Sequence, residues 1–366
     1  MNTNQIYGLV NSVASQAFGG TAIMAVDPSG LISLGDQVLS SSQATEGFMN
    51  VLCQRIGRTV YHYRAYRNKL RGIILESDME WGAILQKINM ELPAAVQDDA
   101  YDLVDGQSVD PWIITKPQVS QKLFVGRNPY SFRITISRKT LKEAFLSESA
   151  MGSFIGFVFG KIRNMIEASY EELARTAIGQ AIVQSSHVVP LVSNYNTVSG
   201  QSLTADSAKL DKDFLAYATG QINLYTDLLT DMSELYNDGS TQTFSPKEDQ
   251  RLTVLSSFER QLETVLQYQA FHDGYVKLAG YEAINFWQAA QTPDIVKQTK
   301  IGGAETTVEN VVAVLHDRDA VGVYQMDEEV LTTPVNARGL YYSVFYHIMK
   351  NMFLDSSENL VVFTLN

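Results

Sequence analysis

The sequence predicts an α+β fold organised around one long helix. Three observations support this prediction: a helical pattern without proline at residues 153–184, strand-like segments on both sides of it, and a composition of 45% hydrophobic and 19% charged residues. This composition is typical of a folded globular chain and not of a disordered one. With 366 residues, the chain has room for two or three domains.

The longest pattern runs from Ser153 to Gln184 (SFIGFVFGKIRNMIEASYEELARTAIGQAIVQ). Its apolar residues recur at steps of three and four, so they share one face of a helix. Ser153 is the expected N-cap, and Pro190 limits the helix at its other end. A helix of this length measures about 45–50 Å at 1.5 Å per residue, which is longer than a compact domain is wide. Three glycines within it argue against a coiled-coil seam. We therefore interpret it as a spine that other elements cross, with a core helix of an ordinary domain as the alternative.

The N-terminal residues 1–47 are rich in Ser, Gly, Gln and small apolar residues and show weak periodicity. They predict an extended arm with a short helix at Gln5–Ala17. The next segment, Thr45–Ile56, has the pattern of a short amphipathic helix. A solitary domain gains little from an arm, whereas an assembling subunit can lay it on a neighbour.

Charge is segregated in the following hundred residues. Arg55–Arg71 carries six basic residues and no acid, whereas Glu76–Asp110 carries nine acids and Lys87 as its one base. Residues 60–136 read as a long excursion with two strand-like legs, Arg58–Arg71 and Phe132–Ile136. A hairpin of that reach cannot bury both faces on its own subunit, so we expect it to contact a partner.

The opposite charges at the two ends of this excursion suit head-to-tail contacts between identical copies. The candidate contact residues are the bases Arg64, Arg67, Lys69 and Arg71 and the acids Asp98, Asp99 and Asp102. A solvated surface is the simpler alternative for such charge runs. The tyrosines interleaved with the bases could also stack single-stranded bases, but the net charge of −12 disfavours general binding to nucleic acid.

The remaining patterns alternate between helices and strands. Helices are expected at Ser137–Ala144, Thr204–Tyr236 and Ser257–Tyr268. Strands are expected at Arg251–Leu255, Val311–Leu315, Ala320–Tyr324, Leu340–Met349 and Leu360–Leu365, with polar turns at His316–Asp319 and Asp355–Asn359.

The residue types that carry catalysis or bind metals are scattered. The five histidines form no metal-binding spacing, and Cys53 is the single cysteine, which excludes an intramolecular disulfide and a cysteine zinc site. There is no GxSxG or phosphate-binding glycine motif. We therefore expect no enzyme, metal or cofactor; in the alternative of an enzyme with a dispersed site, Cys53 or His316 would carry it. No apolar run approaches the roughly 18 residues of a membrane span, and the N-terminus lacks the features of a secretory signal.

The C-terminal residues 313–364 (AVLHDRDAVGVYQMDEEVLTTPVNARGLYYSVFYHIMKNMFLDSSENLVVFT) resemble the closing segment of the major capsid proteins of small short-tailed double-stranded-DNA phages. The matching features are an apolar strand, an Asp-Arg-Asp turn, a second strand ending near Tyr324, Asn336, the run Arg338-Gly339-Leu340-Tyr341 and aromatic residues up to His347. Gly47–Val60 gives a weaker match. The order of arm, hairpin, spine helix, distal domain and return strands matches across nearly the whole chain.

The resemblance implies the capsid fold shared by tailed phages and herpesviruses. It divides the chain into an N-terminal arm (1–47), a peripheral-domain segment (48–59), an extended loop (60–136), a peripheral domain with the spine helix (137–199), an axial domain (200–312) and return strands to the peripheral domain (313–366).

The resemblance also implies a function. Pentamers and hexamers of the chain would form an icosahedral shell around packaged double-stranded DNA, with the help of a scaffolding protein and a portal. The chain would then be a virion component that assembles in the host cytoplasm. A tail- or portal-associated structural ring protein is the alternative.

Overall fold

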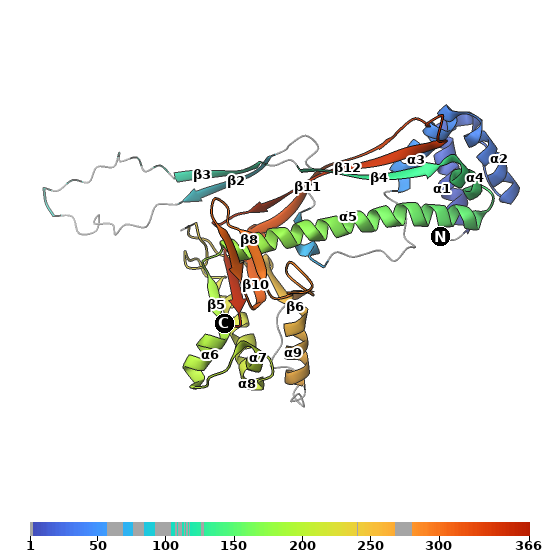
Figure 1. Ribbon diagram of the computed structural model, residues 1–366. Helices are drawn as coiled ribbons and strands as arrows, with labels where there is room; N and C mark the ends of the chain where they lie inside the picture. Colours follow the sequence, from blue (N-terminus) through green and yellow to red (C-terminus); the bar gives the residue numbers. More distant parts are fainter. Residues whose placement is uncertain are drawn as a thin grey trace.

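The computed structural model describes residues 3–56, 69–75, 84–91, 118–125, 128–239, 241–267 and 280–366, together with residues 104–106, 108, 112, 114 and 116. Figure 1 shows a long upper part, which runs beside one helix, and a lower lobe beneath one end of it. The N-terminus lies at the far end of the upper part, and the C-terminus lies in the lobe. None of the helices in the described residues has the length and apolar character needed to cross a bilayer.

The central helix, α5 (Glu148–Gln184), confirms the predicted spine. It begins earlier than expected, because the hydroxyl of Ser147, and not that of Ser153, caps it by accepting a hydrogen bond from the backbone N–H of Ala150. Its end at Gln184 agrees with the prediction. The helix contains 37 residues, so it is about 55 Å long at 1.5 Å per residue.

Two separate hydrophobic cores lie along α5. Its first half contributes Met151, Ile155 and Ile162 to a core shared with the N-terminal helices. Its second half contributes side chains such as Ala174 and Ile178 to the core of the lower lobe. Because one helix supplies both cores, it connects the two ends of the molecule, as a spine would.

The N-terminal residues do not form the extended arm that the sequence predicted. They fold into α1 (Thr3–Phe18), α2 (Pro28–Leu39) and α3 (Ser42–Ile56). Val10, Val13 and Leu34 are fully buried in the core that these helices share with α5. The helices predicted at Gln5–Ala17 and Thr45–Ile56 are confirmed as α1 and α3, whereas α2 was not predicted. Burial against α5 stabilises these helices despite a sequence of weak intrinsic helix propensity.

A four-stranded sheet lies along the spine, in the order β1-β11-β12-β4. Its strands are β1 (Ile74–Leu75), β4 (Asn128–Ser137), β11 (Val321–Thr332) and β12 (Tyr341–Leu354). The last three pair antiparallel as a long ribbon beside α5, and α4 (Arg138–Ala144) follows β4 near the N-terminal helices (Figure 1). The predicted strand Phe132–Ile136 is therefore confirmed, and among the described residues its partner is β12. Most of the other predicted leg, Arg58–Arg71, lies outside the described residues.

The lower lobe is built on a five-stranded sheet in the order β5-β13-β10-β6-β7. Its strands are β5 (Val188–Pro190), β6 (Gln250–Leu255), β7 (Tyr281–Ile284), β10 (Val311–Asp317) and β13 (Leu360–Thr364). The helices of this lobe are α6 (Leu191–Ser199), α7 (Ala205–Ala208), α8 (Lys212–Leu228) and α9 (Ser256–Gln267). A small hairpin of β8 (Val296–Thr299) and β9 (Glu305–Val308) packs on α5.

Three sequence expectations change in this region. The expected helix Thr204–Tyr236 is two helices, α7 and α8, although Gly220 does not interrupt α8. His316 and Asp317 belong to strand β10 and not to a turn. The return strands divide between the two sheets, since β11 and β12 join the upper sheet while β10 and β13 join the lobe, and the expected boundary at 312/313 falls inside β10.

Candidate functional site

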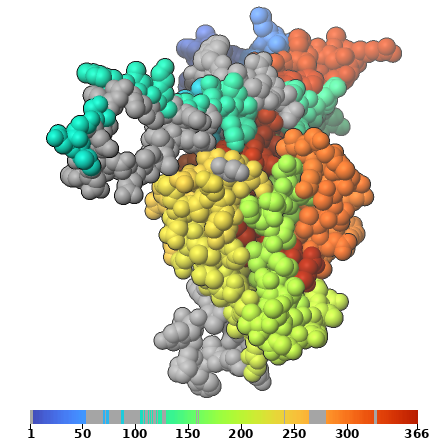
Figure 2. All heavy atoms as spheres, turned by 90° about the vertical axis from the view of Figure 1, so that its left-hand side faces the viewer, coloured from blue at the N-terminus to red at the C-terminus, as the bar shows by residue number. Residues whose placement is uncertain are grey.

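A two-stranded hairpin extends from the body on the side opposite the N-terminal helices (Figure 1). It consists of β2 (Ile84–Glu91) and β3 (Gln118–Val125), which pair antiparallel over their full lengths. The described residues of the connection between these strands, shown in teal, lie well away from the body in Figure 2. This hairpin lies within the excursion that the sequence predicted to reach a partner.

The two faces of the hairpin differ in chemistry. Residues directly opposite each other point to the same side, and successive residues alternate between sides. Ile88, Val119 and Leu123 lie on one face and are exposed at 64%, 62% and 51%. In the connection, Trp112 and Ile114 are even more exposed, at 84% and 81%. Isolated exposed apolar residues are common, but a cluster of them on one projecting element indicates an interaction surface.

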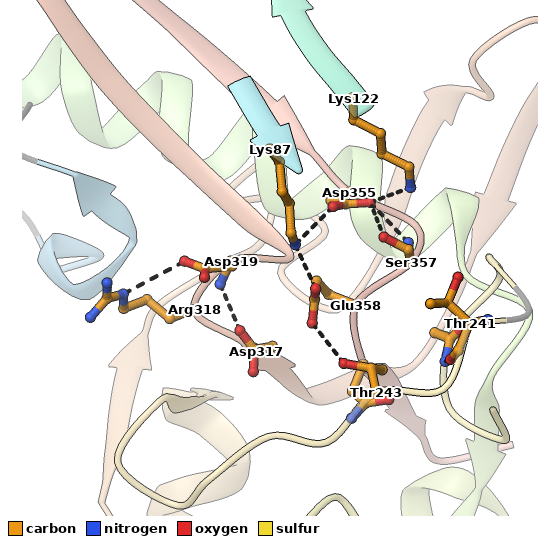
Figure 3. A network of polar contacts seen from close by, with 12 residues as sticks. Lys87, Lys122, Thr241, Thr243, Asp317, Arg318, Asp319, Asp355, Ser357 and Glu358 are labelled. Atoms are coloured by element: carbon orange, nitrogen blue, oxygen red, sulfur yellow. Dashed lines mark hydrogen bonds and ion pairs between the residues drawn. The ribbon is translucent and has the colours of Figure 1, made fainter. Parts of the chain in front are cut away.

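The other face carries two lysines, Lys87 and Lys122, which form ion pairs with Asp355 and Glu358 of the body. We call these four residues the clamp. The ammonium of Lys122 lies 2.6 Å from Oδ1 of Asp355. The ammonium of Lys87 lies 2.9 Å from Oδ2 of Asp355 and 2.5 Å from Oε1 of Glu358. Figure 3 shows both lysines pointing from the hairpin strands toward these carboxylates. The Asp355 side chain is completely buried, whereas that of Lys122 is 40% exposed.

The clamp shifts the titration of its members. Burial raises the pKa of Asp355, but hydrogen bonds from Lys122, Lys87 and Ser357 outweigh burial and lower it to about 2. Burial lowers the pKa of Lys87, and its bonds to Glu358 and Asp355 more than reverse this effect. The pKa of Glu358 stays above its ordinary value, because burial outweighs the opposing bonds from Lys87. The clamp therefore favours the ionised form of Asp355 and the charged form of Lys87, whereas burial disfavours the ionised form of Glu358.

The acidic half of the clamp belongs to the turn between β12 and β13. Ser357 donates to Oδ1 of Asp355 from its backbone nitrogen at 2.9 Å and from its hydroxyl at 2.7 Å. The backbone N–H of Asp355 donates to the carbonyl of Ala320 at 2.7 Å. Thr243 donates to Oε2 of Glu358 at 3.2 Å (Figure 3). The carboxylates thus have partners within the body in addition to the two lysines.

An aromatic contact supports the same end of the hairpin. The rings of Phe124 in β3 and Phe353 in β12 lie 5.6 Å apart in a tilted arrangement. The hydroxyl of Tyr324 donates to the carbonyl of Phe124 at 3.3 Å. Beside these residues lies an open cavity of about 270 Å³, whose lining includes Leu123 and Ile301.

The structure does not test the predicted pairing of bases and acids. Arg64, Arg67, Asp98, Asp99 and Asp102 lie outside the described residues. Lys69 is exposed, and its backbone N–H donates to Oε2 of Glu171 in α5 at 3.4 Å. Arg71 begins a short 3₁₀ helix, Arg71–Ile73. Contacts of these seven residues with a neighbouring copy remain a prediction.

Sequence analysis missed the clamp. Lys87 was visible as the one base in an acidic stretch, and Asp355 was placed in a turn, but no local pattern connected them. Lys122 gave no signal of its own. The connection depends on the strand register, which places Lys87 directly opposite Lys122.

Of the two residues of the enzymatic alternative, the structure describes the side chain of His316 alone. His316 is fully buried in β10, where its Nδ1 lies 2.7 Å from the carbonyl oxygen of Asp317. Cys53 lies in α3, and its side chain is outside the described set. Among the described residues, no group of three or more His, Cys, Asp or Glu side chains is arranged to hold a metal ion.

Comparison with known proteins gives a consistent result. The family described as Phi29-like phage major capsid protein matches residues 9–364. The major capsid protein of Bacillus phage PZA is 23% identical over 332 residues, which cover 90% of this chain and 66% of that protein. The major capsid protein of Bacillus phage B103 is 22% identical and is covered to 74% of its length. The chain thus spans about two thirds to three quarters of these relatives.

Solved structures support the fold. The capsid structure of Staphylococcus phage Andhra contains a chain that aligns with a TM-score of 0.52 at 14% identity, covering 84% of this chain and 87% of that one. A chain from the capsid of Cyanophage P-SCSP1u gives a TM-score of 0.51 at 12% identity, with coverages of 84% and 90%. These similarities confirm the predicted α+β capsid fold.

Proposed function

The chain belongs to the Phi29-like phage major capsid protein family, and from this premise we propose that its copies assemble, through the hairpin β2–β3, into the shell of a phage head. The observation that carries the proposal is the exposed apolar face of this hairpin, together with Trp112 and Ile114 in its connection. An isolated two-stranded hairpin is marginally stable in water, so this face gains most from burial on another molecule.

The proposed assembly is an icosahedral shell of pentamers and hexamers around double-stranded DNA. The contact is heterologous: the hairpin of one copy lies on the body of the next, and such head-to-tail contacts close into rings. Burial of each half-exposed apolar side chain is worth on the order of 1 kcal/mol. Individual contacts are therefore weak, but the many contacts of each copy make a closed shell stable.

Charge supports two further parts of the proposal. The bases Arg64, Arg67, Lys69 and Arg71 meet the acids Asp98, Asp99 and Asp102 of a neighbouring copy, and these pairs set the register of the ring. The net charge of −12 favours a wall that encloses DNA without adhering to it. A scaffolding protein and a portal are the expected assembly partners, the virion is the expected location after assembly in the host cytoplasm, and we expect no catalytic activity.

The test replaces apolar residues of the outward face by charged ones. Ile88→Lys combined with Leu123→Lys leaves the core intact, so we expect the unfolding midpoint of the unassembled chain to change little. We expect electron microscopy and sedimentation velocity to show loss of shells and larger assemblies, because the new charges cannot be buried.

The matched control is Ile88→Val combined with Leu123→Met, which keeps the face apolar and should keep assembly. Shells of normal number and size from the double-lysine chain would rule out the apolar face as the contact. A chain that no longer folds would appear directly in the unfolding curve and would be replaced by the single variant Val119→Lys.

A further inference from the structure

The register of the hairpin creates a repulsion that the hairpin cannot relieve by itself. Lys87 and Lys122 are directly opposite each other on neighbouring strands. Like charges in such pairs destabilise a two-stranded sheet. The Asp355 carboxylate forms ion pairs with both ammonium groups, at 2.9 Å from Lys87 and 2.6 Å from Lys122, and so offsets their repulsion. The paired strands are therefore most stable where this carboxylate can reach both lysines.

The receiving turn is a rigid anchor. Asp355 is held by Ser357 and by the carbonyl of Ala320, as described above. At the other end of the turn, Asn359 donates from Nδ2 to the hydroxyl of Ser245 at 3.1 Å, and its carbonyl accepts from Asp317 N–H at 2.9 Å. Asp355 and Asn359 are buried. Because the turn connects β12 to β13, it is fixed to both large sheets.

Two attachment points from different strands determine the rotation of the hairpin about its long axis. The aromatic contact of Phe124 with Phe353 and the hydrogen bond from Tyr324 to the Phe124 carbonyl both involve one residue of β3. Lys87 adds a point on β2, and Lys122 adds a second point on β3. Since side chains alternate between faces, binding of the lysine face directs Ile88 and Val119 away from the body, whereas Leu123 on the same face is half exposed and lines the open cavity described above.

We propose that Asp355 is a positioning residue for assembly: through Lys87 and Lys122 it holds the hairpin in one direction, with the apolar face outward, before a neighbouring copy binds. The role in assembly rests on the proposed function, whereas the direction of the hairpin is a property of the unassembled chain. Preorganisation of this kind removes the cost of ordering the hairpin at the moment of contact.

The test measures the direction of the hairpin in the unassembled full-length chain. Spin labels are attached at Gln121→Cys on the outward face and at Thr176→Cys on α5, both exposed, in a Cys53→Ser background that leaves no other thiol. Electron–electron double resonance of the parent should give one narrow distance peak. Asp355→Asn and Lys122→Met should lose this narrow peak, and Lys122→Arg should restore it, because arginine keeps the charge.

Lys297→Met is the matched control, because Lys297 also binds a carboxylate across a two-stranded hairpin, that of Glu305 at 3.1 Å. It should leave the narrow peak unchanged. A broad distribution in the parent, or a narrow unchanged peak in both Asp355→Asn and Lys122→Met, would overturn the proposal. Lys122 is partly exposed, so its replacement tests the clamp even where Asp355→Asn does not fold.

Assembly of the same variants separates this inference from the proposed function. Loss of the narrow peak together with loss of shells supports both. Loss of the narrow peak with normal shells supports the clamp but contradicts the assembly role of the hairpin direction, and with it the positioning claim.

Discussion

Replacement of the buried Lys350 by methionine should stabilise the unassembled chain at neutral pH. Lys350 lies in β12 and is 1% exposed. Its ammonium lies 4.5 Å from the ring centroids of Tyr130 and Tyr170 and donates to the hydroxyl of Ser169. It therefore lies between β4, β12 and α5, opposite the irregularity in β11 between Gln325 and Asp327. Burial lowers its pKa from 10.5 to about 8, and the charge of Glu172 opposes this shift only in part.

The size of the effect follows from this pKa. A difference of about 2.5 pKa units corresponds to about 3 kcal/mol against the charged amine in the folded state. Methionine removes this cost, but it also loses two cation–ring contacts worth about 0.5–1 kcal/mol each and a hydrogen bond worth about 1 kcal/mol. The expected net gain in the free energy of unfolding at pH 7 is therefore up to about 1 kcal/mol.

The pH dependence gives a sharper test. Because the folded-state pKa of Lys350 lies below the unfolded value, the unfolded state binds more protons between about pH 8 and 10.5. The stability of the parent should therefore rise relative to that of Lys350→Met over this range, so the advantage of the variant disappears or reverses. Urea unfolding of both chains at pH 7 and pH 10 measures this difference, in which the other titrating groups cancel.

Lys139→Met is the control, since the Lys139 side chain is 86% exposed and its pair with Glu143 is long at 3.9 Å. Its free energy of unfolding at pH 7 should stay close to that of the parent. If Lys350→Met lowered the free energy of unfolding by more than about 1 kcal/mol at pH 7, the cation–ring contacts would outweigh desolvation, and the reasoning would be refuted.

Two further predictions concern the core. Gly322→Ala in β11 should lower the free energy of unfolding by about 1–3 kcal/mol in urea titrations, because the added Cβ would overlap the Phe353 ring and approach the Ile73 carbonyl to 3.2 Å. The control is Gly220→Ala in α8, where an added Cβ meets nothing within 4 Å and should stabilise the helix. Equal effects of the two substitutions would contradict the argument. Burial lowers the pKa of His316 below 6.5, although Asp317 opposes this shift. The unfolded state therefore binds more protons in acid, and the free energy of unfolding should fall as the pH drops below about 6.5. His316→Gln should lose this part of the pH dependence in unfolding measured between pH 7.5 and 5, and a parallel decline in both chains would contradict the prediction.

Local periodicity correctly predicted the helices and strands whose buried residues lie on one face of the element. The spine helix, the strand Gln250–Leu255 and the helix Ser256–Gln267 all lie within a few residues of their expected positions, apart from the early start of the spine. The expected start at Ser153 was wrong, and the residue directly before it, Gly152, lies inside the helix. In the structure its missing side chain makes room for Ile6 of α1, whose Cδ1 would lie 3.0 Å from an added Cβ.

Two of the three N-terminal helices, α1 and α3, were predicted at Gln5–Ala17 and Thr45–Ile56, whereas α2 was missed although the sequence signals its start. Asp27 caps α2 by accepting a hydrogen bond from the backbone N–H of Gly30, and Pro28 occupies the first helical position. In α1, the small residues lower the helix propensity, so only tertiary contacts make the helix stable. These contacts come from α3 and α5, whose positions a local pattern does not contain.

Local sequence patterns could not predict how the hairpin, the upper sheet and the lobe are connected, for a different reason. β12 has 14 residues and contributes Val344 to the N-terminal core and Ile348 to the lobe core, so no boundary between domains can be read along it. The turn that follows it then binds lysines that lie more than 200 positions earlier in the chain. Polar residues of one short turn thus connect the hairpin, the upper sheet and the lobe. Such contacts depend on strand register and on ion-pair geometry, which local sequence patterns do not contain. Many helices and strands of this molecule could therefore be predicted from sequence, whereas the ion pairs of the Asp355–Asn359 turn could not.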